Sequence, residues 1–360
     1  MIAGIAVAVA IPIAFLLLVR WLDLYASGSF WTVILCFIWG VLAFSIVFPI
    51  NDFFIARLGY WEVVKGTAPV VEEITKSLML IYLVRRPNFT YFVDGAIFGF
   101  AIGTGFAVRE NIFYLTSTPD VSLMLGLTRA FSTSLMHGSA SALVGVALGR
   151  LRFARGWSRI IAPVVGWTAA IALHLSYNNI INTQDAGLII ILIGVVIGLG
   201  GVGLNAGFIM WGLQEEKRWL RETLKLDVGV SSGESSVIQK LDDLSEMLVP
   251  IRDRFGPEKA KQVETFLRLQ AQLGLKRKVQ AMSPDGKLRE ELTVQIADMR
   301  TEMDKLRRSV GVYCMSYVRS ILPPETESFL INLSERMVVQ EPTAKGSLWN
   351  KIGSRFDADE

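Results

Sequence analysis

The sequence predicts an all-α protein, in which a polytopic bundle of about seven transmembrane helices precedes a cytoplasmic α-helical domain. Composition is the first observation: 52% of the residues are apolar and the mean hydropathy is +0.43, above the range of soluble domains. The second is that the apolar residues form runs of membrane-spanning length. The third is charge, because residues 1–212 hold 12 Lys/Arg and 9 Asp/Glu, whereas the remaining 148 residues hold 24 of each.

Seven apolar runs predict the spans. A hydrocarbon core of about 30 Å needs about 20 helical residues at roughly 1.5 Å each. The first run has no basic residue ahead of it and is long enough to span, so we expect a retained helix and not a cleaved signal peptide. The predicted spans are residues 2–19, 30–50, 67–84, 92–115, 121–148, 160–181 and 187–212.

The basic residues of the short loops predict the orientation. The loops on one side carry only Arg57 and Lys65. Those on the other carry Arg20, Arg85, Arg86, Arg150, Arg152, Arg155 and Arg159. By the positive-inside rule the second set is cytoplasmic. We therefore expect a multi-pass protein of a cell membrane, with its amino terminus outside and its carboxy-terminal domain in the cytoplasm.

Two spans contain stripes of glycine. The fourth span has glycine at every fourth position, and the seventh repeats the pattern more loosely: Gly95, Gly99 and Gly103, then Gly194, Gly198 and Gly201. A stripe without side chains lets a neighbouring helix backbone approach closely. We expect close helix packing there and no chemistry.

Ionisable residues gather inside four of the spans. Such groups cost several kcal/mol at the bilayer centre, on the order of 3 kcal/mol by insertion scales, and persist where they face a partner or a wet cavity. The chain has two histidines, and both lie in predicted spans. The full set is Glu72, Glu73 and Lys76 in the third span, Arg109, Glu110 and Asn111 in the fourth, Arg129 and His137 in the fifth, and His174 and Asn178 in the sixth. Their joint placement predicts one cavity lined by these groups.

Spacing along the helices suggests roles for some of these residues. Lys76 lies four residues after Glu72 and three after Glu73, so it can reach one of the two carboxylates and keep it ionised. Adjacent glutamates cannot share one helical direction, so we expect one to be a working base and the other a structural acceptor. Spacing does not say which. His174 and Asn178 share a stripe, where they can polarise a carbonyl and hold an oxyanion.

At these residues the sequence resembles the PrsW family of intramembrane proteases, which is related to the CAAX prenyl endopeptidases and the bacteriocin-processing membrane proteases. The matching segments, in order, are Glu72-Glu73-Ile-Thr-Lys76, Asp94-Gly95 through Gly105-Phe106-Ala-Val-Arg-Glu110-Asn111, His137-Gly138, and His174-Leu-Ser-Tyr-Asn178. The wider superfamily often has FxxxH where this chain has Phe106-Ala-Val-Arg-Glu110, with His137 supplying an imidazole from the next span. The resemblance implies a membrane-embedded endopeptidase, in a bacterial inner membrane.

The mechanism that we expect is hydrolysis of a peptide bond in or near a membrane segment. Glu72 or Glu73 would be the general base for a water molecule, His137 and Glu110 would position or share its proton, and His174 with Asn178 would stabilise the oxyanion. Two histidines and a glutamate, here His137, His174 and Glu110, also suffice to hold catalytic zinc with an open water position. The sequence lacks a HExxH helix, and it leaves metal-dependent and metal-free versions open.

Two other functional classes remain open from the sequence. A catalytically inert receptor or scaffold would use the same fold, and a proton-coupled carrier would also need intramembrane Glu and His. A carrier usually shows internal repeats, and none is evident between the halves. The partner expected of a protease is a membrane-anchored protein substrate in the lipid bilayer. No nucleic acid is expected.

The second half of the chain predicts a separate organisation. We expect a membrane domain over residues 1–212, a linker over 213–236, a cytoplasmic helical domain over 237–340 and a disordered tail over 341–360. One apolar stripe ends at Gly256-Pro257, a second helix runs to about Leu273, and Ser283 to Gly286 forms a turn. The third stripe, close to a heptad pattern, is Leu288, Leu292, Ile296, Met299, Met303, Leu306 and Val310. It packs within a small bundle or between two subunits, and this domain is expected to bind a regulator.

Overall fold

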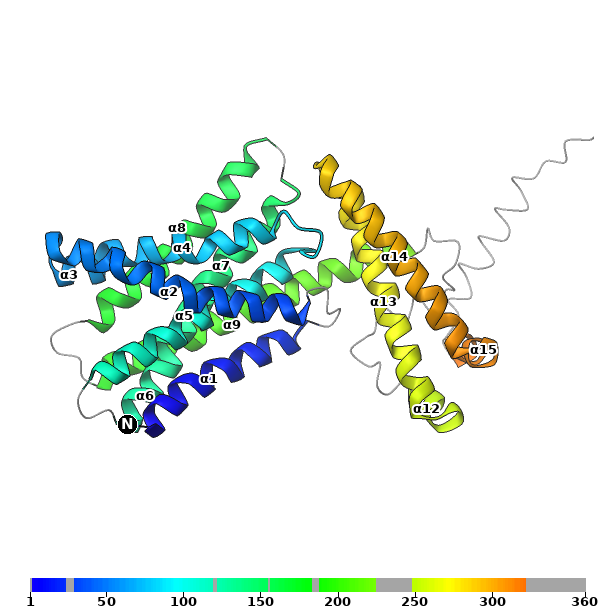
Figure 1. The fold of residues 1–360 in the computed structure, drawn as a ribbon, viewed down its shortest axis with the longest axis horizontal. Helices are drawn as coiled ribbons and strands as arrows, with labels where there is room; N and C mark the ends of the chain where they lie inside the picture. Colours follow the sequence, from blue (N-terminus) through cyan, green and yellow to red (C-terminus); the bar gives the residue numbers. More distant parts are fainter. Residues whose placement is uncertain are drawn as a thin grey trace, which may run out of the picture.

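The computed structural model describes residues 2–23, 29–118, 122–154, 156–182, 188–224 and 248–321, and within these residues it contains helices and no strands. Figure 1 shows a bundle formed by the first helices and a second group formed by α12 to α15. The elements of the bundle are α1 (Ile2–Trp21), α2 (Phe30–Leu58), α3 (Tyr60–Glu62), the π-helical turn η1 (Val63–Thr67), α4 (Ala68–Leu83), α5 (Phe92–Ser117), α6 (Leu123–Arg129), the π-helical turn η2 (Ala130–Ser134), α7 (Leu135–Leu151), α8 (Ser158–Ile181) and α9 (Leu188–Leu224).

Six of the predicted spans are long and apolar enough to cross a membrane: α1, α2, α5, the continuous segment Leu123–Leu151, α8 and α9. The prediction of a multi-pass helical membrane protein is thereby confirmed. The remaining predicted span is α4, whose 16 residues are shorter. It contains Glu72, Glu73 and Lys76, all buried, and it continues the helical segment that starts at Tyr60. α4 packs against α2, α7 and α8, so it belongs to the bundle and presents charged residues to its interior.

α5 is the central helix of the bundle. Its apolar window is 94% buried, and it packs against α1, α2, α7 and α9. The glycine stripe is the reason for the close packing against α7. A Cβ atom added at Gly95, Gly99 or Gly103 would overlap a backbone carbonyl of α7, so any larger residue would force the helices apart. The second stripe also includes a close approach to a backbone, because a Cβ at Gly198 would overlap the carbonyl oxygen of Phe131.

The second group of helices comprises α12 (Val249–Phe255), α13 (Pro257–Met282), α14 (Gly286–Val310) and α15 (Val312–Ile321). The turn predicted at residues 283–286 joins α13 to α14, where Asp285 accepts hydrogen bonds from the amides of Lys287 and Leu288. The heptad-like stripe packs onto α13 within the chain. α13 continues beyond the predicted end near Leu273, because Leu275 and Val279 are also buried.

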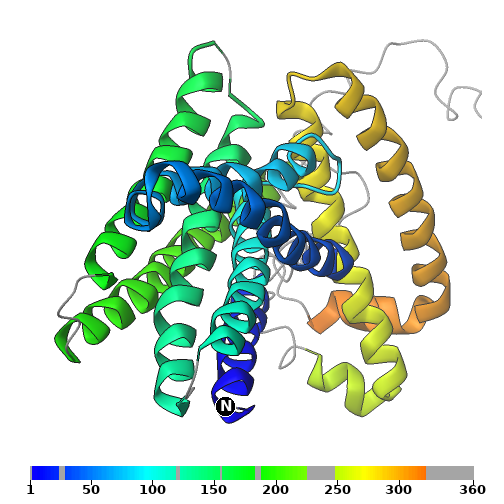
Figure 2. The same cartoon turned by 60° about the vertical axis from the view of Figure 1, so that its left-hand side comes forward.

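This group contacts the end of the bundle where α4 ends, as Figure 2 shows from a second direction. Lys276 donates to the carbonyl of Pro87 at 3.1 Å and Gln295 donates to Asn88 at 3.2 Å. Residues 213–224 of the predicted linker continue α9 as helix. The rest of that linker, the start of the first stripe (Ile238, Leu241, Leu244) and the tail 341–360 lie outside the described residues.

Candidate active site

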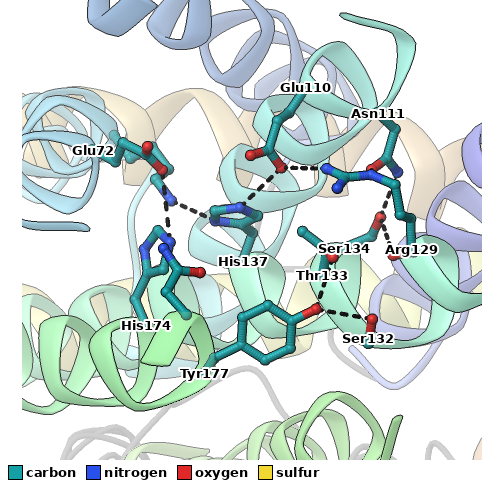
Figure 3. A network of polar contacts seen from close by, with 12 residues as sticks. Glu72, Glu110, Asn111, Arg129, Ser132, Thr133, Ser134, His137, His174 and Tyr177 are labelled. Atoms are coloured by element: carbon teal, nitrogen blue, oxygen red, sulfur yellow. Dashed lines mark hydrogen bonds and ion pairs between the residues drawn. The ribbon is translucent and has the colours of Figure 1, made fainter. Parts of the chain in front are cut away.

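Five of the ionisable residues predicted from the spans line one cavity of about 190 Å³ inside the bundle, namely Glu72, Glu110, Arg129, His137 and His174. Arg109 is not among them and lies over the ring of Phe44. The carboxylates and imidazoles each come from a different helix, as Figure 3 shows: Glu72 from α4, Glu110 from α5, His137 from α7 and His174 from α8. All four line the cavity, together with Asn178. Residues about 100 positions apart therefore meet, as the sequence predicted.

Glu73 is the structural acceptor of the glutamate pair. It is fully buried, and its Oε1 lies 2.6 Å from Lys76 Nζ and 3.0 Å from His174 Nδ1. Its Oε2 accepts from Ser141 at 3.4 Å. Because Lys76 is itself 1% exposed, the two buried charges satisfy each other. Glu73 thus accepts from three protein donors and is not among the residues that line the cavity.

Glu72 has one carboxylate oxygen without a partner. Its Oε1 accepts a hydrogen bond from Asn51 of α2 at 3.3 Å. Its Oε2 is buried and, within the described part of the chain, has no hydrogen-bond partner. His174 Nε2 is 3.8 Å from that oxygen. Of the two adjacent glutamates, Glu72 is therefore the one that faces the cavity with free lone pairs.

The Glu73–Lys76 pair fixes opposite tautomers on the two histidines. A carboxylate only accepts, so His174 donates through Nδ1 and its Nε2 carries a lone pair. An ammonium only donates, so Nδ1 of His137 accepts from Lys76 at 3.0 Å and its Nε2 carries the proton. That proton points at Glu110 Oε2, 3.3 Å away. The rings lie 4.6 Å apart between centroids, so the cavity contains a ring donor beside a ring acceptor.

Glu110 is held by Arg129 of α6. Arg129 Nη2 lies 3.1 Å from Glu110 Oε2, and its Nε donates to Asn111 Oδ1 at 2.8 Å. Asn111 in turn donates to the carbonyl of Ala8 and to the hydroxyl of Ser134. This network orients the Glu110 carboxylate toward His137 (Figure 3).

Asn178 is placed differently from the expectation. Its Nδ2 donates to the carbonyl oxygen of Val64 at 2.8 Å. Val64 belongs to η1, where the π-helical turn changes the regular hydrogen-bond pattern of the backbone. One of the two amide hydrogens of Asn178 is thus used to hold η1 over the cavity, and the other remains for a ligand.

Seven polar residues of the cavity were not singled out from the sequence: Asn51, Asp52, Tyr60, Tyr114, Thr133, Tyr177 and Asn182. Asn51 was not predicted to lie in a span, because the second span was predicted to end at residue 50, whereas α2 continues to Leu58. Thr133 precedes His137 by about one helical turn, and Tyr177 follows His174 by about one helical turn. This helical spacing from the histidines is the feature of the sequence that could have identified Thr133 and Tyr177 as cavity residues.

The donor set fits a divalent metal ion at Glu72, His137 and His174, whose ligand atoms lie within 4.8 Å of one another. Glu72 Oε2, buried and without a partner, is the orphaned donor that such an ion would use. His174 Nε2 already carries a lone pair, whereas His137 Nε2 would offer one only with the ring proton on Nδ1, which requires that Lys76 no longer donates to Nδ1. The sequence suggested Glu110 as the carboxylate ligand. In the structure the carboxylate whose oxygen lies with the histidine ligand atoms is that of Glu72. Glu110 instead forms an ion pair with Arg129.

Comparisons with known proteins agree with this geometry. A family model described as PrsW family intramembrane metalloprotease matches residues 28–201, a range that includes every residue of the cavity discussed above. A "Protease PrsW" of Clostridioides difficile (strain 630) is 25% identical over 201 residues, covering 52% of this chain and 78% of that protein. A "Protease PrsW" of Bacillus subtilis (strain 168) is 29% identical over 115 residues, covering 31% of this chain and 50% of that protein. No solved structure matches.

Proposed function

This chain belongs to the PrsW family of intramembrane proteases, and from that premise we propose that it hydrolyses a peptide bond in or near a membrane segment of a membrane-anchored protein, with Glu72 as the general base. The observation that carries the proposal is the pair of facing lone pairs on Glu72 Oε2 and His174 Nε2, 3.8 Å apart. A water molecule beside both atoms can donate one hydrogen bond to each of these acceptors, at about 2.8 Å from each. A water molecule there would be held by both and activated by either.

In this mechanism the water loses a proton to Glu72 as its oxygen bonds to the substrate carbonyl carbon. The carbonyl oxygen becomes an oxyanion and needs donors. The free amide hydrogen of Asn178, which lines the cavity, is the donor in this proposal, because the single ring proton of His137 is directed at Glu110. The sequence suggested His174 for this role, but its single ring proton is used by Glu73.

Collapse of the tetrahedral intermediate breaks the carbon–nitrogen bond. The departing nitrogen takes up the proton that Glu72 received from water, which regenerates the carboxylate and balances the reaction. Glu110 and Arg129 keep His137 oriented throughout. Glu72, His174 and His137 would hold a divalent cation such as zinc, which supplies Lewis-acid activation of the water when bound.

The walls of the cavity support the substrate class. Phe44, Val47, Phe48 and Ile55 of α2 contribute apolar lining to the cavity, in addition to its polar residues from α5, α7 and α8. An apolar segment of a membrane-anchored protein suits such a cavity, because its side chains contact the α2 wall while its backbone meets the polar groups. We further propose the orientation with α12–α15 in the cytoplasm, where this group binds a regulator or a second copy through residues 237–340.

The test compares the ends of membrane proteins by mass spectrometry in cells expressing the wild type, E72Q or E62Q. Glu62 is an exposed glutamate of α3 that does not line the cavity, so E62Q is the matched control. We expect wild type and E62Q to share fragments that E72Q lacks, with cleavage lowered at least about 100-fold by loss of the base. Identical fragments in all three would contradict the role of Glu72 and favour an inert receptor.

Metal analysis of purified protein separates the two versions of the mechanism. Stoichiometric zinc in the wild type, whose removal by a chelator abolishes cleavage and whose return restores it, excludes the metal-free version. Full cleavage by protein without bound metal excludes the metal-dependent one. An H174A protein with full activity would contradict both, because each version uses the Nε2 lone pair.

A further inference from the structure

Three hydroxyl groups lie one helical turn from the two histidines. Thr133 Oγ1 is 2.8 Å from Tyr177 Oη, and Tyr177 Oη is 2.9 Å from Ser132 Oγ. Ser132 Oγ is 2.6 Å from the carbonyl oxygen of Thr128. Ser132 and Thr133 belong to the π-helical turn η2, and Tyr177 follows His174 on α8 (Figure 3).

The direction of every proton in this chain follows from its far end. The carbonyl of Thr128 can only accept, so the Ser132 hydroxyl donates to it. Ser132 has one proton, so it accepts from Tyr177. Tyr177 has then used its own proton, so it accepts from Thr133. The Thr133 hydroxyl proton therefore points at Tyr177, and its remaining lone pair is left for the cavity.

Thr133 consequently presents an acceptor, and no donor, to the cavity. It is 8% exposed and lines the cavity with Glu72, His137 and His174. Its oxygen can accept a hydrogen bond but cannot donate one to a ligand. Tyr177, although it also lines the cavity, cannot donate to an oxyanion, since its proton is used by Ser132.

We infer that Thr133 Oγ1 accepts a hydrogen bond from a backbone N–H of the substrate next to the scissile peptide bond, and so positions the substrate chain. This rests on the proposed function. A segment that is opened for hydrolysis loses its helical hydrogen bonds, and each buried N–H without a partner costs about 1 to 3 kcal/mol. Thr133 precedes His137 by about one helical turn. An acceptor in that position can bind the N–H of a substrate residue next to the scissile bond. Thr133 is a substrate-positioning residue in this proposal.

The test uses a synthetic peptide that carries the cleavage site mapped in the wild-type cells. A series of esters replaces one flanking amide N–H at a time by oxygen, leaving the scissile bond unchanged. With wild-type protein we expect one ester position to lower kcat/KM about tenfold, the loss of one neutral hydrogen bond. T133V removes the acceptor at nearly constant volume, so it should lower kcat/KM of the amide peptide about tenfold and abolish the sensitivity to that ester.

T133S and Y177F are the controls. T133S keeps the oxygen and should keep the ester sensitivity. Y177F removes the same internal hydrogen bond that T133V removes but leaves the Thr133 lone pairs, so it too should keep the sensitivity whatever it does to the overall rate. Thermal unfolding of each purified variant accompanies the kinetics, so that a loss of fold is seen directly.

A failure of the inference about Thr133 can be distinguished from a failure of the proposed function. If wild type cleaves and E72Q does not, the proposed function stands. If T133V, folded as judged by its unfolding, then retains the full ester sensitivity, the inference about Thr133 is overturned. It is also overturned if no ester position affects the wild type, which would assign the Thr133 lone pair to water and not to the substrate.

Discussion

The membrane bundle and the α12–α15 group use opposite ways to pack two helices. In the bundle, Gly95, Gly99 and Gly103 of α5 bring the backbone of α7 into contact, and we call this the glycine seam. In the other group, Leu288, Leu292 and Ile296 of α14 are buried against α13, and we call this the leucine seam. In lipid, burying an apolar side chain gains little, so helices associate through close backbone contact. In water the same burial is the main driving force.

The difference has a consequence for the site. His137 is itself the residue whose carbonyl lies against Gly103, so the glycine seam sets the position of a residue of the cavity. The leucine seam is remote from the cavity and affects the stability of its own helices. Substitutions in the two seams should therefore separate activity from stability.

The largest effect is expected from G103A. The added methyl overlaps the carbonyl of His137, and overpacking against rigid backbone costs about 3 kcal/mol or more. We expect a lower unfolding temperature in detergent and loss of cleavage, because His137 moves. G200A is the matched control, since a Cβ at Gly200 meets no atom within 4 Å. Equal behaviour of the two variants would refute the close packing of the glycine seam.

The second effect is expected from L292A. Leu292 is fully buried, and removing its side chain should lower the free energy of unfolding of the α12–α15 group by about 2 to 5 kcal/mol. Cleavage by the remaining folded protein should persist. V294A on the same helix is the control, because Val294 is 61% exposed. Loss of cleavage in folded L292A would show that the two regions are coupled more strongly than the comparison implies.

The third effect concerns the junction of the two regions and depends on pH. Burial lowers the pKa of Lys276 to about 8, while the unfolded residue keeps a value near 10.5. Between these values the unfolded chain binds more protons, so the free energy of unfolding should rise with pH, by about 1 to 2 kcal/mol from pH 8 to 10. Well below pH 8, where Lys276 is protonated in both states, the cost of the buried charge is fully present.

Thermal unfolding at several pH values checks this expectation, with K276Q as the control. Glutamine can still donate to the Pro87 carbonyl that Lys276 contacts, but it does not titrate. The rise between pH 8 and 10 should therefore be smaller in K276Q than in the wild type. The same slope in both proteins would refute the assignment to Lys276.

The smallest effect is expected at the surface of α13. Glu264 and Arg268 form an ion pair of 3.0 Å with side chains 40% and 38% exposed. Exposed pairs of this spacing contribute about 0.3 to 0.5 kcal/mol. E264Q should therefore change the unfolding temperature by about 2 °C or less. A loss as large as that of L292A would mean that surface charge, and not the leucine seam, stabilises this group.

Much of the site was predictable because charge is costly in lipid. Glu72, Glu73, His137 and His174 could be singled out from their location within apolar runs alone, and the structure brings all of them together. The glycine stripes were predictable for a related reason, since helices in lipid approach closely only where side chains are small. The ends of elements were less predictable, as α2 and α13 show, because a helix continues for as long as tertiary packing supports it.

By itself the sequence determined that the chain crosses a membrane several times, that its charges gather in spans, and that its second half forms amphipathic helices. These properties depend on the local cost of placing each residue in lipid or water. Only the tertiary structure decided that Glu72 and not Glu73 faces the cavity, that the Nε2 atom carries a proton in His137 but a lone pair in His174, and that Asn178 holds η1. Those properties depend on which groups from distant helices lie within hydrogen-bond distance, and a hydrogen bond of about 3 Å is too short-ranged to be inferred from spacing along one helix.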